Sequence, residues 1–188
     1  MKPICLICAR GDSKGVLNKN TRIIHKKPLI AHTIEKAVDS KIFSHVIVST
    51  EDKKIVKISE KYGAEIPFMR PKFLSDDYAS DALVMSHSVM FLVKEAYQFD
   101  YVCCVYPPNP FLQISDLKKG FKKIKSKKFN YVFSATLYRF PFFRSFTFSR
   151  SKGIKVLFKN KINHRSQDLK QIICDAGHFY WGRKEAWL

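Results

Sequence analysis

Short apolar runs alternate along the chain with longer segments in which apolar residues recur every three or four positions. This alternation predicts strands and helices in a repeated order. Strands are expected at residues 4–9, 46–49, 101–106, 131–135 and 175–181. Helices are expected at residues 28–39, 52–62, 81–97 and 115–125. Such an order predicts an α/β fold with a doubly wound, mainly parallel, Rossmann-like sheet.

The pattern changes after Thr136. From there to Phe158, aromatic and polar residues alternate, which predicts a β-rich excursion before the chain returns to the sheet. We expect residues 1–188 to form a single domain, with residues 137–170 as this excursion.

Five cysteines raise the question of a metal or redox site. Cys5 and Cys8 have C-x-x-C spacing, but both lie in an expected strand, where residues three apart point to opposite faces. Their thiols should diverge, as should those of the neighbours Cys103 and Cys104. We interpret the cysteines as small core residues in a reducing compartment. With no signal-peptide pattern and no bilayer-length apolar run, we expect a cytoplasmic protein.

The formal net charge of +18 leaves three interpretations open. A basic surface binds nucleic acid, attracts anionic small substrates, or is a solvated face rich in lysine. In the densest basic run, residues 118–128, the lysines surround an apolar stripe at helical spacing, and no arginine–aromatic interleaving accompanies them. This favours a solvated helix face, with substrate steering second. We expect neither nucleic acid nor a membrane as a partner.

The clearest candidate chemistry lies in the polar loop directly after the first expected strand. Two glycines allow its backbone N–H groups to turn toward an anion, and Ser13 adds a hydroxyl. Arg10, Lys14 and Lys19 add three positive charges, so the loop predicts a triphosphate site. The loop is neither a Walker A motif nor a dinucleotide fingerprint, and a basic surface loop is the alternative.

The same loop reads A-R-x-x-S-K-G with K-N beyond it, which resembles the N-terminal signature of the acylneuraminate cytidylyltransferases. Residues 27–30, 48–52 and 67–77 resemble further segments of that family. Residues 163–169 and 175–182 resemble the pseudaminic acid cytidylyltransferases within it. The resemblance covers the whole chain and implies a nucleotidyltransferase sheet.

The resemblance also implies a reaction. CMP is transferred from CTP to an acidic nonulosonic sugar, closest to pseudaminic acid, and pyrophosphate is released. The implied cofactor is Mg²⁺, the implied assembly a homodimer, and the implied role glycoconjugate biosynthesis. Sialic, legionaminic and 3-deoxy-manno-octulosonic acid are alternative acceptors. A non-catalytic nucleotide-binding remnant is an alternative of another class.

Residue roles follow from the resemblance as well. The β- and γ-phosphates are expected against Arg10, Ser13 and Lys14, and the α-phosphate against Lys19. Arg10 and Lys19 are thereby the catalytic candidates. The other expected nucleotide contacts are Asn20, Arg70, Ala79 and Ser80. The expected sugar contacts are Arg165, Gln167 and Asp175, and residues 137–170 are expected to serve the sugar site or a dimer interface.

Some positions depart from the family pattern. Asp12 places a negative charge in the loop, Lys26 replaces a glycine, and residues 106–110 replace a segment with a nucleotide-contacting glutamine. The family carries a magnesium-binding Asp-x-Asp element near its C-terminus, and the residues up to Leu188 contain no such pair. No metal ligand or general base is therefore identified. We expect a C-terminally truncated member with little or no turnover by itself.

Overall fold

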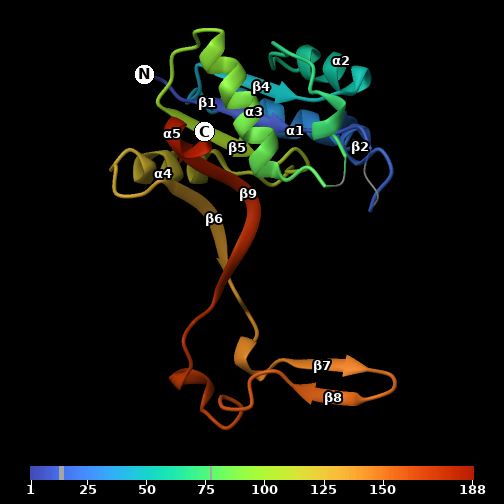
Figure 1. The fold of residues 1–188 in the computed structure, drawn as a ribbon, viewed down its shortest axis with the longest axis vertical. Helices are drawn as coiled ribbons and strands as arrows, with labels where there is room; N and C mark the ends of the chain where they lie inside the picture. The colour runs from blue at the N-terminus through green and yellow to red at the C-terminus, as the bar shows by residue number, and fades with distance from the viewer. Residues whose placement is uncertain (13–14, 77) are drawn as a thin grey trace. The chain divides into compact units, whose positions relative to one another are not determined.

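A five-stranded sheet organises the computed structural model, which describes residues 1–12, 15–76 and 78–188. The strand order is β4-β1-β5-β9-β6 (Figure 1). The strands are β1 (Ile4–Cys8), β4 (His45–Ser49), β5 (Tyr101–Val105), β6 (Tyr131–Leu137) and β9 (Ile173–Arg183). β1 pairs in parallel with β4 and β5, whereas β9 pairs antiparallel with β5. The expected α/β fold is confirmed, and its sheet is mixed around a parallel core.

The chain divides into two compact units. The first, here called the sheet unit, comprises Met1–Ser134 and Gly177–Leu188. The second, here called the hairpin unit, comprises Ala135–Ala176 and contains the antiparallel strands β7 (Phe146–Ser149) and β8 (Gly153–Val156). The predicted β-rich excursion lies within the hairpin unit.

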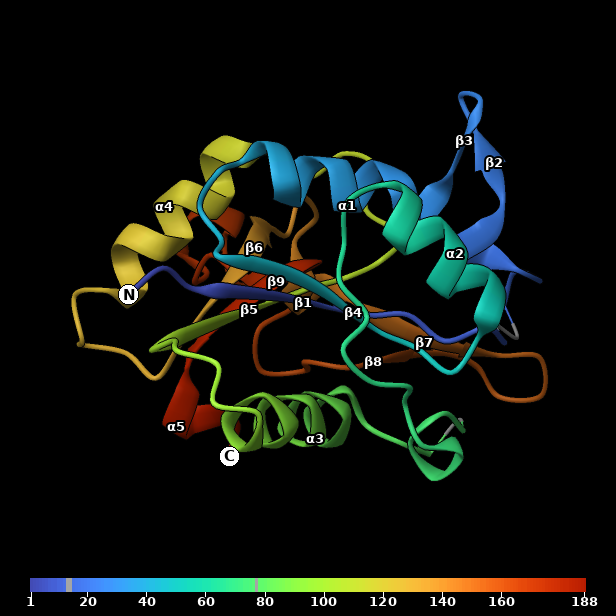
Figure 2. The same cartoon turned by 90° about the horizontal axis from the view of Figure 1, so that it is seen from above.

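Helices cover both faces of the sheet (Figure 2). One face carries α1 (Leu29–Asp39), α2 (Lys53–Lys61) and α4 (Ile114–Ile124). The other face carries α3 (Asp81–Lys94) and α5 (Lys184–Trp187). Among the described helices, none combines the length and apolarity that crossing a bilayer needs.

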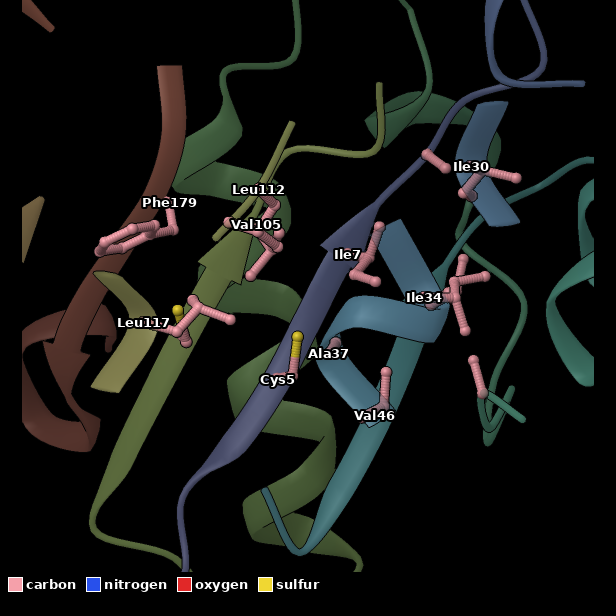
Figure 3. Close-up of a cluster of buried hydrophobic side chains, with 14 of the residues drawn as sticks. Cys5, Ile7, Ile30, Ile34, Ala37, Val46, Val105, Leu112, Leu117 and Phe179 are labelled. Atoms are coloured by element: carbon pink, nitrogen blue, oxygen red, sulfur yellow. The ribbon is translucent and has the colours of Figure 1, made fainter. Parts of the chain in front are cut away.

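The buried apolar side chains form one cluster on each face of the sheet. Figure 3 shows the first, which includes Ile7 of β1 with Ile30 and Ile34 of α1, and Val105 of β5 beside Leu112. Because parallel strands are covered on both faces, their sequences are apolar at consecutive positions. This explains why the runs at β1 and β5 predicted strands correctly.

The cysteines follow the predicted alternation across the sheet. Cys5 and Cys103 belong to the first cluster, whereas Cys104 belongs to the second and Cys8 packs against it. Burial raises the pKa of the Cys5 and Cys103 thiols, so both are protonated core side chains at neutral pH. The prediction that the thiols of the C-x-x-C pair diverge is confirmed.

A small hairpin that the sequence pattern does not predict precedes α1. It pairs β2 (Ile23–Ile24) with β3 (Lys27–Pro28) through a turn at His25 and Lys26, whose φ angles are 48° and 65°. Two positive φ values in a two-residue turn favour Asn and Gly. The glycine of the family pattern suits this backbone, and Lys26 adopts the left-handed conformation in its place.

Candidate functional site

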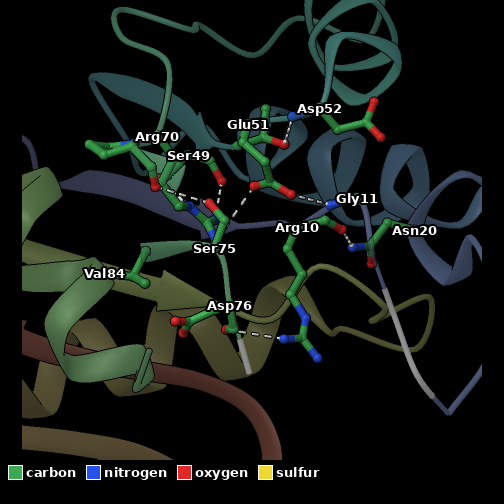
Figure 4. Close-up of polar contacts among 12 residues, drawn as sticks. Arg10, Gly11, Asn20, Ser49, Glu51, Asp52, Arg70, Ser75, Asp76 and Val84 are labelled. Carbon is green, nitrogen blue, oxygen red and sulfur yellow. Dashed lines mark hydrogen bonds and ion pairs between the residues drawn. The ribbon is translucent and has the colours of Figure 1, made fainter. Parts of the chain in front are cut away.

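The candidate site lies beyond the carboxyl ends of β1, β4 and β5, where ligands of open parallel sheets bind. Ala9 N donates to Ser49 O at 3.0 Å, so the loops after β1 and β4 leave the sheet as neighbours. Figure 4 shows Arg10, Glu51 and Arg70 gathered at this edge. Three loops that are distant in the sequence therefore meet at one place.

Asn20 closes the loop after β1. Its buried side chain donates from Nδ2 to the Arg10 carbonyl oxygen at 3.0 Å. Lys19 stands next to it, half-buried, at the start of the 3-10 helix η1 (Lys19–Thr21). Asn20 Oδ1 is buried and has no hydrogen-bond partner among the described residues, so it is an acceptor that a ligand or a water would satisfy. The expected contacts Ser13 and Lys14 lie outside the described residues.

Arg10 contacts the segment that precedes α3. Its Nη1 donates to the Asp76 carbonyl oxygen at 3.3 Å. Asp76 Oδ1 accepts from the backbone N–H groups of Tyr78 at 2.9 Å and Ala79 at 2.8 Å, and the Ser80 hydroxyl caps α3. The structure thus brings Arg10 beside the segment that holds two other expected nucleotide contacts, Ala79 and Ser80.

Arg70 is buried at the end of β4, with 6% of its surface exposed. Its Nε donates to Ser49 Oγ at 3.1 Å, and its Nη2 donates to the Ser49 carbonyl oxygen. Its Nη1 lies 4.0 Å from Glu51 Oε2. These contacts fix the backbone at the strand end. The contact with cytidine that the family resemblance implies stays a prediction.

Glu51 is a site residue that the sequence reasoning missed. Its Oε1 accepts from Gly11 N at 2.6 Å, which joins the loop after β4 to the loop after β1. Its place directly after a predicted strand was the available signal, because strand ends of a parallel sheet share one edge.

Tyr106 directly follows β5 and was also missed as an individual site residue. Its hydroxyl donates to Asp81 Oδ2 at 2.7 Å, and burial together with this bond raises the pKa of Tyr106. Thr33 of α1 fastens the turn that follows: its Oγ1 donates to the Pro107 carbonyl at 2.7 Å and accepts from Asn109 N at 3.1 Å. The segment that replaces the family's glutamine turn is therefore anchored to α1.

The expected sugar contacts lie in the hairpin unit, and all three are exposed. Arg165 precedes the 3-10 helix η4 (Ser166–Asp168), which contains Gln167, and Asp175 lies in β9. Gln167 lines a cavity of about 320 Å³, together with Arg139 and Lys170. The structure places Gln167 beside two basic residues, an arrangement that suits an anion.

The carboxylates near the loop are already engaged in hydrogen bonds within the protein. Glu51 accepts from Gly11 N, Asp52 caps α2, and Asp76 accepts from two backbone N–H groups. Across residues 1–12, 15–76 and 78–188, no three His, Cys, Asp or Glu side chains gather closely enough to hold a metal ion.

Known proteins resemble this chain in sequence and in fold. Residues 4–177 match the family model for cytidylyltransferases. The chain is 38% identical over all of its 188 residues to the pseudaminic acid cytidylyltransferase of Campylobacter jejuni subsp. jejuni serotype O:2, covering 81% of that protein. It is 44% identical over 87 residues to the CMP-N,N'-diacetyllegionaminic acid synthase of the same organism, covering 46% of this chain and 37% of that protein.

A solved structure shares the fold. CMP:2-keto-3-deoxy-manno-octonic acid synthetase, complexed with CTP, superposes with a TM-score of 0.72 and 15% identity. The match covers 100% of this chain and 76% of the synthetase chain. At this identity the likeness concerns the fold alone.

Proposed function

Because the chain belongs to the cytidylyltransferase family, we propose that it transfers CMP from CTP to an acidic nonulosonic sugar and releases pyrophosphate. The observation that carries the proposal is the loop at the carboxyl end of β1, which the bond from Asn20 to Arg10 closes beside Lys19. A closed loop that combines basic side chains with backbone donors suits a triphosphate.

In the proposed reaction, the anomeric oxygen of the sugar attacks the α-phosphorus of CTP. The bond from the α-phosphorus to the bridging oxygen breaks in line, pyrophosphate leaves, and the hydroxyl proton passes to solvent. Lys19 neutralises charge at the α-phosphate, while Arg10, Ser13 and Lys14 hold the leaving group. Positioning and charge neutralisation supply most of the acceleration in phosphoryl chemistry of this kind.

Cytidine recognition is assigned to the region around Asn20, Arg70, Ala79 and Ser80. Arg10 reaches this region through its bond to the Asp76 carbonyl, which supports placing the base and the phosphates at the same strand edge. Mg²⁺ enters the proposal as a companion of CTP, since it commonly keeps its waters and binds substrate phosphates. When bound, it would offset phosphate charge.

Isothermal calorimetry tests the preference of the site for CTP over other nucleotides. CTP should bind more tightly than ATP, GTP or UTP under identical Mg²⁺ and salt. Inorganic pyrophosphate serves as a reference that reports the phosphate loop without any base. Equal affinities for the four nucleotides would remove the cytidylyltransferase proposal, even if all of them bound.

Pseudaminic acid is the sugar that we propose. The motif at residues 175–182 and the 38% identity over the whole chain support this choice. A diacetylated legionaminic acid is the second candidate, supported by the higher identity of 44% over a shorter stretch. A pyrophosphate-release assay with pseudaminic, legionaminic and N-acetylneuraminic acid separates them. A clear preference for either of the last two would refute the assignment.

We further propose that the protein forms a homodimer through the hairpin unit. Phe146 and Phe148 on β7 stand opposite Val156 and Ile154 on β8, so their side chains share one face of the hairpin. Phe148 and Ile154 are 74% and 71% exposed in the single chain. A two-fold symmetric partner would cover the same apolar face on both copies.

A further inference from the structure

The edge of the sheet unit holds a carboxylate where an anion is expected to bind. Glu51 Oε1 accepts from Gly11 N at 2.6 Å, a short hydrogen bond to a carboxylate oxygen. Glu51 Oε2 is buried and accepts no hydrogen bond from the described residues. A negative charge beside a bound triphosphate is repulsive, unless a neighbouring positive charge offsets it.

The surroundings hold this carboxylate in place. Arg70 Nη1 lies 4.0 Å from Oε2, and the Arg70 side chain is 4% exposed, so a buried positive charge faces the buried carboxylate oxygen. Ser49 fixes the guanidinium by accepting from two of its nitrogens. The Glu51 side chain is therefore held from one side by Arg70 and from the other by Gly11.

Gly11 packs closely against Asp52, with no room for a side chain. A Cβ added to it would lie 2.5 Å from Asp52 Oδ2 and 3.0 Å from Asp52 Cβ. Asp52 has little freedom to move away, because its Oδ1 accepts from Lys54 N at 2.6 Å and from Ile55 N at 3.1 Å as the cap of α2. The start of the loop after β1 is thus seated on residues 51 and 52.

We infer that Glu51 is a positioning residue for the phosphate loop, acting through its hydrogen bond to Gly11 N. It does not touch the nucleotide. It fixes the backbone at Gly11, where the loop leaves β1, and thereby the position of the adjoining Arg10. The Gly11 N–H is consequently not a phosphate donor. The inference rests on the proposed function, because it takes the ligand of this loop to be a polyphosphate.

Two neutral variants test the hydrogen bond apart from the charge. Glu51→Gln keeps an oxygen that accepts from Gly11 N, whereas Glu51→Ala keeps none. Both remove the same negative charge. Binding of pyrophosphate, CTP and CMP is measured by calorimetry for the wild type and both variants. Glu51→Ala should bind pyrophosphate and CTP roughly three- to tenfold more weakly than Glu51→Gln, as expected for the loss of a hydrogen bond between neutral groups. CMP affinity should stay within about twofold.

A role in general stability would act differently. It would weaken CMP binding as much as CTP binding and would lower the melting temperature in step. Glu60→Ala, an exposed position on α2, is the matched control and should change none of these values. If Glu51→Ala and Glu51→Gln bind pyrophosphate equally, or Glu51→Ala binds it more tightly, the inference is overturned. This holds whatever the nucleotide preference of the wild type.

Amide hydrogen exchange gives an answer that needs no variant. Gly11 N–H should exchange slowly in the wild-type protein, because it donates a short hydrogen bond to the Glu51 carboxylate. Fast exchange at Gly11 would overturn the inference even if Glu51→Ala fails to fold. Wild-type protein that binds pyrophosphate without favouring CTP would refute the proposed function and leave this inference standing. Wild-type protein that binds neither would refute both.

Discussion

β1 and the strands of the β7–β8 hairpin are all short and all carry apolar side chains, yet they bury these side chains to different extents. From Ile4 to Ile7, every side chain of β1 is fully buried between the helices of the two faces. In the hairpin, Phe148 and Ile154 stay more than two-thirds exposed. Apolar sequence therefore serves internal stability in the sheet unit and is available for association in the hairpin unit.

The contrast has an energetic meaning. Burying apolar surface contributes about 25 cal/mol per Å², so side chains that remain exposed contribute little to the folding of one chain. Changes in the sheet unit should then appear in the free energy of unfolding, and changes on the hairpin face should appear in self-association. The following substitutions test this division.

The largest effect is expected at Trp181. This side chain is fully buried and stacks on Phe43 and Phe121, with ring centroids 5.4 and 5.0 Å away. Trp181→Ala should lower the free energy of unfolding by about 3–5 kcal/mol, the range for a large aromatic truncated in a core. Urea denaturation measures it, with Phe148→Ala as the exposed aromatic control. Equal losses of unfolding free energy in the two variants would contradict the proposed difference between the sheet unit and the hairpin unit.

The next largest effect is expected at Lys19, and it concerns turnover rather than stability. Lys19→Ala should lower turnover by about 10²- to 10³-fold, because a donor to developing charge is lost, and should change CTP affinity far less. Pyrophosphate release measures it. The control is Lys57→Ala on the exposed surface of α2. Near-normal turnover would show the assignment to be wrong.

Substitutions on the apolar face of the hairpin should change self-association rather than stability. Phe146→Ser combined with Phe148→Ser should change the free energy of unfolding of the single chain by less than about 1 kcal/mol, because exposed positions tolerate such changes. The same pair should shift the dimer toward monomer in sedimentation analysis at micromolar protein. A parent protein that is monomeric at all concentrations would remove the dimer proposal.

The smallest effect is expected from His87, and it depends on pH. Desolvation, with a smaller contribution from the charge of Arg70, lowers the pKa of His87 below the ordinary 6.5. The unfolded chain then binds a proton that the folded chain does not, so stability should be unaffected above this range and should fall as the pH drops below about 6.5. His87→Gln should flatten that slope in denaturation curves taken from pH 7.5 to 5. An unchanged slope would contradict the role of His87.

The fold was largely predictable because β1, β4 and β5 are covered on both faces and read as continuous apolar runs. The alternation of a strand also correctly assigned Cys5 and Cys8 to opposite faces. The direction of β9 was not predictable, since side-chain period is the same in parallel and antiparallel strands. The β2–β3 turn was missed because Lys26 occupies a left-handed position that usually signals itself through glycine.

Less of the site was predictable. The closed loop after β1 agrees with the sequence pattern, because the loop, its glycines and Asn20 are close in sequence. The bond from Glu51 to Gly11 spans 40 positions and depends on the register of β1 against β4, which no local pattern encodes. The bond from Arg70 to Ser49 spans 21 positions, so it was equally out of reach of a local pattern.

The position of the hairpin unit in the chain has a consequence for how such proteins diversify. β6 and β9 are neighbours in the sheet, and Ser134 Oγ accepts from the backbone N–H groups of His178 at 3.1 Å and Phe179 at 3.3 Å. The chain thus leaves and re-enters the sheet unit between two neighbouring strands that these hydrogen bonds join. Topologically, Ala135–Ala176 is a cassette. Exchanging it, or shortening it to a turn, alters only a loop closure, whose entropic cost grows slowly with length. Because the sugar contacts that we propose lie in this segment, we expect acceptor preference to change with it while the sheet edge proposed for the nucleotide keeps its sequence.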